Sequence, residues 1–213
     1  MNKNDQFIED LTSEFKGFQV VRPSYHVALY WTTTSLALVA LAAYLNGPFR
    51  PTWVSQILLS PRFAAEMATG VLTVFFTCWL CLAGAIPGSK TKRLAFLSSL
   101  FGSAFLALNV YSLFEPAATV SMAGKRPHCL IEGFAVSIGL TIGLLFLVRR
   151  RAPEGLVAAG LLSGLASCLI CATTMHVACM YDPMHIMKHH VGLPLLVSLI
   201  AGAGLGTVFL KKH

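Results

Sequence analysis

The chain has 213 residues, of which 55% are hydrophobic and 12% are charged, and its mean hydropathy is +0.69. Soluble domains carry about 25% charged residues, so this composition excludes an ordinary water-soluble domain, and the high hydrophobicity excludes a disordered chain. At about 20 residues per membrane span, the length allows roughly five to seven transmembrane helices and no sizeable soluble domain.

Six apolar stretches follow one another along the chain, each bounded by charged residues, proline or glycine. They cover residues 26–45, 63–86, 94–114, 129–148, 155–179 and 191–210. Because an open strand would leave unpaired backbone groups in hydrocarbon, we expect all six to be helices. The sequence therefore predicts an all-α, multi-pass protein with a six-helix transmembrane domain over 26–213, preceded by a polar tail, 1–25.

Lysine and arginine are distributed unequally between the two sides of the predicted bundle. One side carries 11 of the 16, in the tail, the loops 90–93 and 149–151, and the C-terminal end. Because cytoplasmic segments are enriched in Lys and Arg, we expect both termini to be cytoplasmic. The charge of +7 is then a topology signal and not a site for direct nucleic-acid binding, and we interpret the run Arg149–Arg151 as a topology anchor.

The tail carries apolar side chains at three- and four-residue steps, which would share one face of a helix. These side chains are Phe7, Ile8, Leu11, Phe15 and Phe18. A short amphipathic helix either enters a groove on a partner protein or lies on the membrane. The polar face is more acidic than basic, which favours a protein partner over the lipid bilayer, and a disordered leader is the third possibility.

Four of the six cysteines form two CxxC pairs inside spans, Cys78 with Cys81 and Cys168 with Cys171. A CxxC pair is typical of redox chemistry only where the thiols are exposed and their pKa is lowered. Within apolar helices we expect these four to be buried and unreactive.

Cys129 and Cys179 differ, because both fall at span ends on the side opposite the termini. Histidines accompany them, namely His128, His176, His185 and His190. Thiolate with imidazole suits a soft or borderline metal ion such as copper(I), zinc or cadmium, and the spacing of His176 and Cys179 predicts one shared helical face. The alternative is that the histidines only tolerate an interfacial loop, with the two cysteines as a disulfide or as free thiols.

Glu132 lies one turn inside the fourth span, on the same face as Cys129. Carboxylates inside spans are costly and are usually functional or paired. Because Glu132 is close to the end of the span, reaching out to the membrane surface is an equal alternative.

Several segments carry a resemblance to a known family. They are Ser60-Pro61-Arg62-Phe63 leading into a span closed by Pro87-Gly88, Cys129-Leu130-Ile131-Glu132, Cys179-Met180-Tyr181-Asp182-Pro183, and His190 before the last span. In this order, with six spans and a short cytoplasmic head, the chain resembles the NrsF family of bacterial inner-membrane anti-sigma factors (negative regulator of sigma F). Cys129, Glu132, Cys179 and Asp182 are the most specific part of the resemblance.

The resemblance implies a multi-pass protein of the bacterial inner membrane that holds an extracytoplasmic-function sigma factor inactive. It implies that the tail binds the sigma factor and that the external cysteines sense heavy metals or oxidants. Two features depart from the family pattern, a loop with Met184, His185, Met187 and His189, and a phenylalanine-rich head.

Two other functions follow from the residues alone. A thiol- and histidine-dependent transporter or carrier could pass a heavy metal along Cys168, Cys171 and Cys179 of the fifth span. A quinone-linked thiol oxidoreductase is less favoured, because it needs a reactive CxxC pair at the external face. We expect a protein that is not an enzyme, because no catalytic triad, phosphate loop or paired catalytic carboxylates are visible.

Overall fold

The computed structural model describes residues 6, 22–116 and 119–211, and they form helices. These are α2 (Ser24–Leu45), α3 (Trp53–Leu59), α4 (Pro61–Gly84), α5 (Lys92–Tyr111), α6 (Cys129–Arg149), α7 (Leu156–Ala178), α8 (Pro183–His185), the π-helix η1 (Ile186–Gly192) and α9 (Leu193–Phe209). Counting Pro183–Phe209 as one, six helices are long and apolar enough to cross a membrane, which confirms the predicted all-α, six-span class. The predicted stripe of the tail lies outside the described residues.

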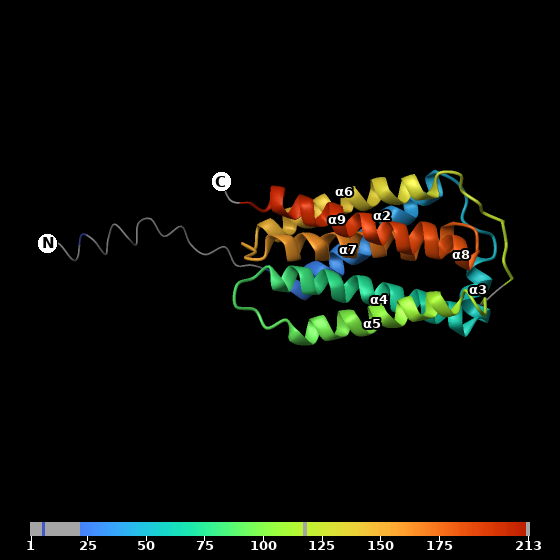
Figure 1. The fold of residues 1–213 in the computed structure, drawn as a ribbon, viewed down its shortest axis with the longest axis horizontal. Helices are drawn as coiled ribbons and strands as arrows, with labels where there is room; N and C mark the ends of the chain where they lie inside the picture. Colours follow the sequence, from blue (N-terminus) through green and yellow to red (C-terminus); the bar gives the residue numbers. More distant parts are fainter. Residues whose placement is uncertain (1–5, 7–21, 117–118, 212–213) are drawn as a thin grey trace.

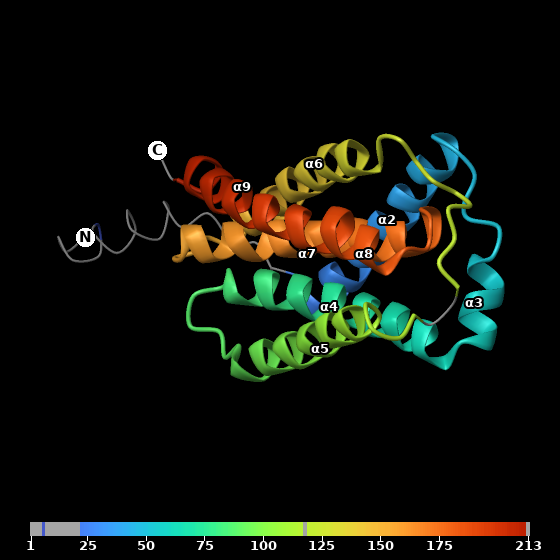
Figure 2. The ribbon, with the colours of Figure 1, turned by 45° about the vertical axis from the view of Figure 1, so that its right-hand side comes forward.

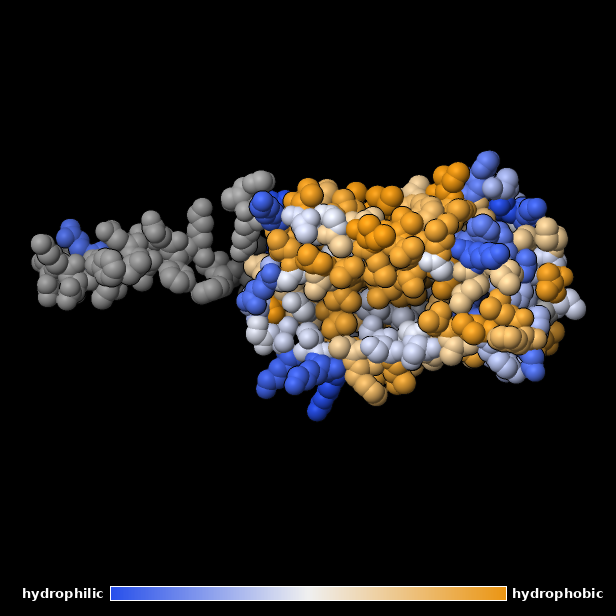
Figure 3. Space-filling view, viewed as in Figure 1, coloured by the Kyte–Doolittle hydropathy of each residue, from blue (hydrophilic) through white to orange (hydrophobic). Residues whose placement is uncertain are grey.

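The long helices run side by side, with α7 at the centre (Figures 1 and 2). Helices α2, α4, α6 and α9 pack around α7, and α5 packs on the outside of α4. The start of α2 and the end of α9 lie at one end of the bundle, the tail end, whereas α3 and α8 lie at the other, the loop end (Figure 1). Apolar residues form a belt between two polar ends (Figure 3), as expected for a bundle that lies in a bilayer.

The sixth spanning helix begins at Pro183, eight residues before the expected start at Val191. Asp182 caps it, because its Oδ1 accepts a hydrogen bond of 3.0 Å from the backbone N–H of Met184, and proline is favoured in the first turn. Hydropathy places the start too late because Lys188 and three histidines lie in the added turns.

Helices α7 and α9 approach until their backbones touch. A Cβ atom at Gly160 would lie 2.2 Å from the carbonyl oxygen of Gly202, and one at Gly164 would lie 2.1 Å from that of Ser198. Small residues permit this packing between membrane helices, where dispersion replaces the hydrophobic effect. The contact joins α7 and α9 into one rigid pair.

The two CxxC pairs are buried, as the sequence predicts. Cys78, Cys81, Cys168 and Cys171 are between 0% and 4% exposed. The Cys81 sulfur lies 3.3 Å from the Ser163 hydroxyl, between α4 and α7. These thiols therefore belong to the packed interior of the bundle.

We expect Gly202→Ala to destabilise the protein by about 1–3 kcal/mol, because its methyl group would overlap the backbone of α7. Gly204→Ala is the matched control, since a Cβ atom there meets nothing within 4 Å. The measurement is the midpoint of thermal unfolding in detergent. Equal midpoints for the two variants would contradict the close α7–α9 packing.

Candidate metal centre

Two chain segments bring the predicted cysteines together at the loop end. Cys129 is the first residue of α6, and Cys179 directly follows α7. Between α5 and α6, the backbone N–H of Ser121 donates a 2.8 Å hydrogen bond to the carbonyl of Tyr181. This isolated bridge ties the segment before Cys129 to the segment after Cys179.

The backbone turns out of the helix at Cys179, where φ is −95° and ψ is 172°. This extended conformation takes Cys179 off the helical face that the sequence assigned to it together with His176. His176 stays inside the bundle, where its Nε2 lies 2.8 Å from Asn109 Oδ1 and its Nδ1 lies 2.8 Å from the carbonyl oxygen of Ala172. The expectation that His176 shares a ligand set with Cys179 is therefore corrected, since both ring nitrogens have partners elsewhere.

The π-helix η1 places two histidines beside each other. On an α-helix, residues five apart point about 140° away from each other. A π-helix bonds residue i to i+5, and here the backbone N–H of Leu193 donates to the carbonyl of Lys188. The wider turn brings the rings of His185 and His190 to a centroid distance of 5.0 Å.

Cys129, Cys179, His185 and His190 form one cluster, in which a donor atom from each lies within 4.8 Å of the others. Nε2 of His185 lies 3.4 Å from the sulfur of Cys129 and 3.6 Å from the sulfur of Cys179. Around a tetrahedral zinc ion, neighbouring sulfur and nitrogen donors lie about 3.3–3.8 Å apart. We call these four residues the Cys/His cluster; its geometry suits one tetrahedral, borderline-soft cation.

Three of the four cluster residues are buried and one is half-buried. Cys129, Cys179 and His190 are at most 4% exposed, whereas His185 is half-buried. Nε2 of His190 is buried without a hydrogen-bond partner among the described residues, although buried polar groups are nearly always paired. A cation bound by the cluster would give the His190 ring a further partner, and the half-buried His185 is the most exposed of the four residues.

The electrostatics around Cys179 favour its thiolate. A hydrogen bond from the Cys129 thiol and the neighbouring His190 hold the pKa of the Cys179 thiol well below its usual range. Burial lowers the pKa of Arg50 to about 10, so its guanidinium keeps its charge near neutral pH. Arg50 Nη1 donates to the Cys179 carbonyl at 3.5 Å, and its charge lies over the Phe63 and Tyr181 rings.

Arg126 and Glu132 lie next to the cluster. Arg126 is 7% exposed and its Nη1 lies 3.5 Å from Glu132 Oε2. Glu132 is thus paired, and its side chain, in the first turn of α6, is also 25% exposed. Arg126 and Arg50 are among the 5 of 16 lysines and arginines that the sequence places in the loops opposite the termini, and a count of charges gives them no other role. A sequence signal for Arg126 is its position three residues before a span that begins with cysteine.

The remaining predicted ligand, His128, lies outside the cluster and is exposed before α6. Asp182, which the resemblance marks as a sensing residue, serves as the cap of α8. The sequence therefore predicts more metal ligands than the four residues that the structure brings together.

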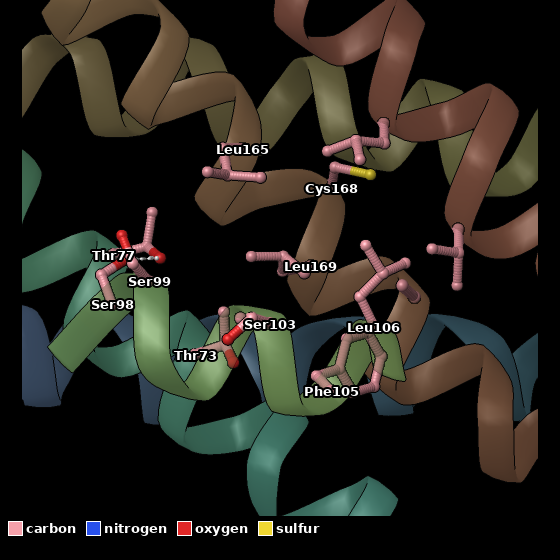
Figure 4. Close-up of a pocket in the computed structure, with 14 residues that line it drawn as sticks. Thr73, Thr77, Ser98, Ser99, Ser103, Phe105, Leu106, Leu165, Cys168 and Leu169 are labelled. Carbon is pink, nitrogen blue, oxygen red and sulfur yellow. Dashed lines mark hydrogen bonds between the residues drawn. The ribbon is translucent and has the colours of Figure 1, made fainter. Parts of the chain in front are cut away.

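A cleft lies elsewhere, between α4 and α5 on one side and α7 and α9 on the other (Figure 4). It has a volume of about 380 Å³, and Thr77 and Ser98 join across α4 and α5 by a 2.8 Å hydrogen bond. Its lining is apolar side chains and hydroxyl groups, with Cys168 as the one thiol. Ionic chemistry is therefore concentrated at the Cys/His cluster and not in the cleft.

A family model described as "NrsF: Negative regulator of sigma F" matches residues 11–211. No curated protein and no solved structure matches the chain. The match extends from the tail through all six spanning helices and includes every residue of the Cys/His cluster. The chain belongs to the NrsF family, the negative regulators of sigma F.

Proposed function

We propose that this protein holds an extracytoplasmic-function sigma factor inactive through its N-terminal tail and releases it when a metal or oxidant reaches the Cys/His cluster. Family membership supports an anti-sigma factor with a sigma-factor partner. The observation that carries the finer proposal is the convergence of Cys129, Cys179, His185 and His190 at the loop end, opposite the end where α2 begins.

The charge distribution supports a cytoplasmic tail in a bacterial inner membrane. The tail end carries 11 of the 16 lysines and arginines, and such an excess marks the cytoplasmic side. The Cys/His cluster then faces the oxidising side of the membrane, where thiols meet external metals and oxidants. An anti-sigma factor needs this arrangement, since sigma factors work in the cytoplasm and the stress arises outside.

The composition of the tail supports a protein partner. Its apolar stripe would fill a groove, as amphipathic helices do in partner proteins. Four of the nine acidic residues of the chain lie in the tail, which disfavours adsorption to anionic lipid. The tail is therefore the proposed binding segment for the sigma factor.

The chemistry of the cluster supports a thiophilic or borderline cation as the signal. Two sulfur and two nitrogen donors at zinc-like spacing suit zinc or cadmium, and oxidation to a disulfide is the matching response to an oxidant. Both events draw Cys129 toward Cys179, and so draw α6 toward the end of α7. In this way a chemical event at the loop end becomes a movement of helices.

A metal carrier has less support. Among the described residues, the Cys/His cluster is the one group of three or more possible ligands that meets in space. Cys168 and Cys171 are buried in the fifth span without a second ligand group of this kind within the described part of the chain. A relay of metal along α7 lacks the intermediate sites that transport needs.

We expect Phe15→Asp to weaken recovery of the sigma factor at least about tenfold, or about 1.4 kcal/mol, because it places a charge on the proposed binding stripe. Ser13→Asp is the matched control, since it adds the same charge on the opposite face of the predicted helix. The measurement is the amount of extracytoplasmic-function sigma factor that co-purifies with the full-length chain. If both variants retain it equally, the tail is not the binding segment.

We expect purified, reduced protein to bind one cadmium ion per chain, with the ultraviolet absorbance of a cadmium–thiolate bond. Cys129→Ser and Cys179→Ser should abolish this absorbance, because each removes a thiolate ligand. His190→Ala should weaken binding at least about tenfold, whereas His189→Ala, the control outside the cluster, should leave it unchanged. Wild-type binding by both serine variants would rule out the cluster as the metal site.

A further inference from the structure

Two buried arginines bracket α6, one at each end of the bundle. Arg126 precedes the first residue of α6 by three positions, and Arg151 follows the last residue by two. Both are 7% exposed, whereas their neighbours Lys125, Arg149 and Arg150 are exposed. Burying a guanidinium is costly unless its donors are satisfied, so these two differ in kind from the surrounding basic residues.

At the loop end, Arg126 binds the C-terminal carbonyls of two helices. Its Nη2 donates to the carbonyl oxygens of Ala43 at 2.7 Å and Gly47 at 2.6 Å, at the end of α2. Its Nε donates to that of Ala178, the last residue of α7, at 3.3 Å. Helix C-termini have unpaired carbonyls and a negative partial charge, so a buried cation fits there.

At the tail end, Arg151 binds the start of α2. Its Nη1 donates to the Ser24 hydroxyl at 2.7 Å, and its Nη2 donates to the Arg22 carbonyl oxygen at 3.1 Å. Nη1 also lies 3.5 Å from the carbonyl oxygen of Leu82 near the end of α4. Arg151 therefore holds the residues through which the tail joins the bundle, which we call the tail root (residues 22–24).

Between the two arginines, α2 and α6 touch at few places. A Cβ atom at Gly143 would lie 2.7 Å from the Trp31 ring, which marks one contact near mid-bundle. A cavity of about 20 Å³ lies beside Glu132, between α2, α6 and α7. Helix α2 packs mainly against α4 and α7 instead. The arginines are therefore the strong connections between α6 and α2.

We infer that α6 transmits movement between the Cys/His cluster and the tail root, with Arg126 and Arg151 coupling its two ends to α2. Cys129 is both a cluster residue and the first residue of this 21-residue helix, which is about 30 Å long. A shift of Cys129 moves α6 as a unit, and each arginine passes the shift to one end of α2. The inference rests on the proposed function for its signal and its output, but the mechanical link is a property of the bundle itself.

The first experiment tests the link without any metal. Hydrogen–deuterium exchange is measured over residues 22–30 of the full chain in nanodiscs, for Arg126→Ala and for its exposed neighbour Lys125→Ala. We expect Arg126→Ala to raise exchange at this distant end at least about threefold and Lys125→Ala to leave it as in wild type. Arg126→Lys, which keeps the charge but not the fork of donors, should behave like the alanine variant and guards against misfolding of the latter. Exchange that rises only near residues 43–48 would overturn the inference.

The second experiment tests the link in signalling. Arg151→Ala and Arg150→Ala remove the same charge from the same loop, so they affect topology equally, but only the first removes the coupling. With cadmium as the probe, we expect both to bind the metal as wild type does and Arg151→Ala to reduce induction of a sigma-dependent reporter at least about tenfold. Wild-type induction in Arg151→Ala would overturn the inference. Absence of cadmium binding or induction in wild type would instead contradict the proposed function, and the exchange experiment then decides the link alone.

Discussion

A guanidinium group has five N–H donors and no acceptor, so burying one requires a matching set of oxygens. Around Arg126, the carbonyl oxygens of Ala43, Gly47 and Ala178 at the ends of α2 and α7 supply that set. Residues 178 and 179 are held at this point by Arg126 and Arg50 through backbone carbonyls. The position of Cys179, and with it the geometry of the cluster, depends on these two buried cations.

Hydropathy predicts the six spans well because burial in lipid depends on length and apolar content, which are local properties of the sequence. Hydropathy places the start of the last span too late, because Asp182 and Pro183 begin a helix whose first turns are polar. The short α3 was not identified, because seven residues are too few to stand out as a span. Local patterns thus predict which segments cross the membrane, but not the residue at which each helix begins.

The candidate site was only partly predictable. Residue types indicated Cys129, Cys179, His185 and His190, but they equally indicated His176, which the structure pairs with Asn109. The distinction depends on an extended residue after α7 and on a π-helical turn, and neither has a local signature in the chain. The arginines were counted as loop charges because a count of charges does not reveal burial. In the run Arg149–Arg151, two side chains are exposed and the third is not.

The glycine contact between α7 and α9 has a consequence for the cluster. Cys179 follows α7, and His185 and His190 lie on the extension of α9, so three of the four donors belong to one rigid pair of helices. Cys129 alone comes from α6. Binding of an ion by all four residues therefore depends on one variable, the position of α6 relative to the α7–α9 pair. By thermodynamic linkage, if the bound ion changes the affinity of the tail for its partner by some factor, the bound partner must change the affinity for the ion by the same factor.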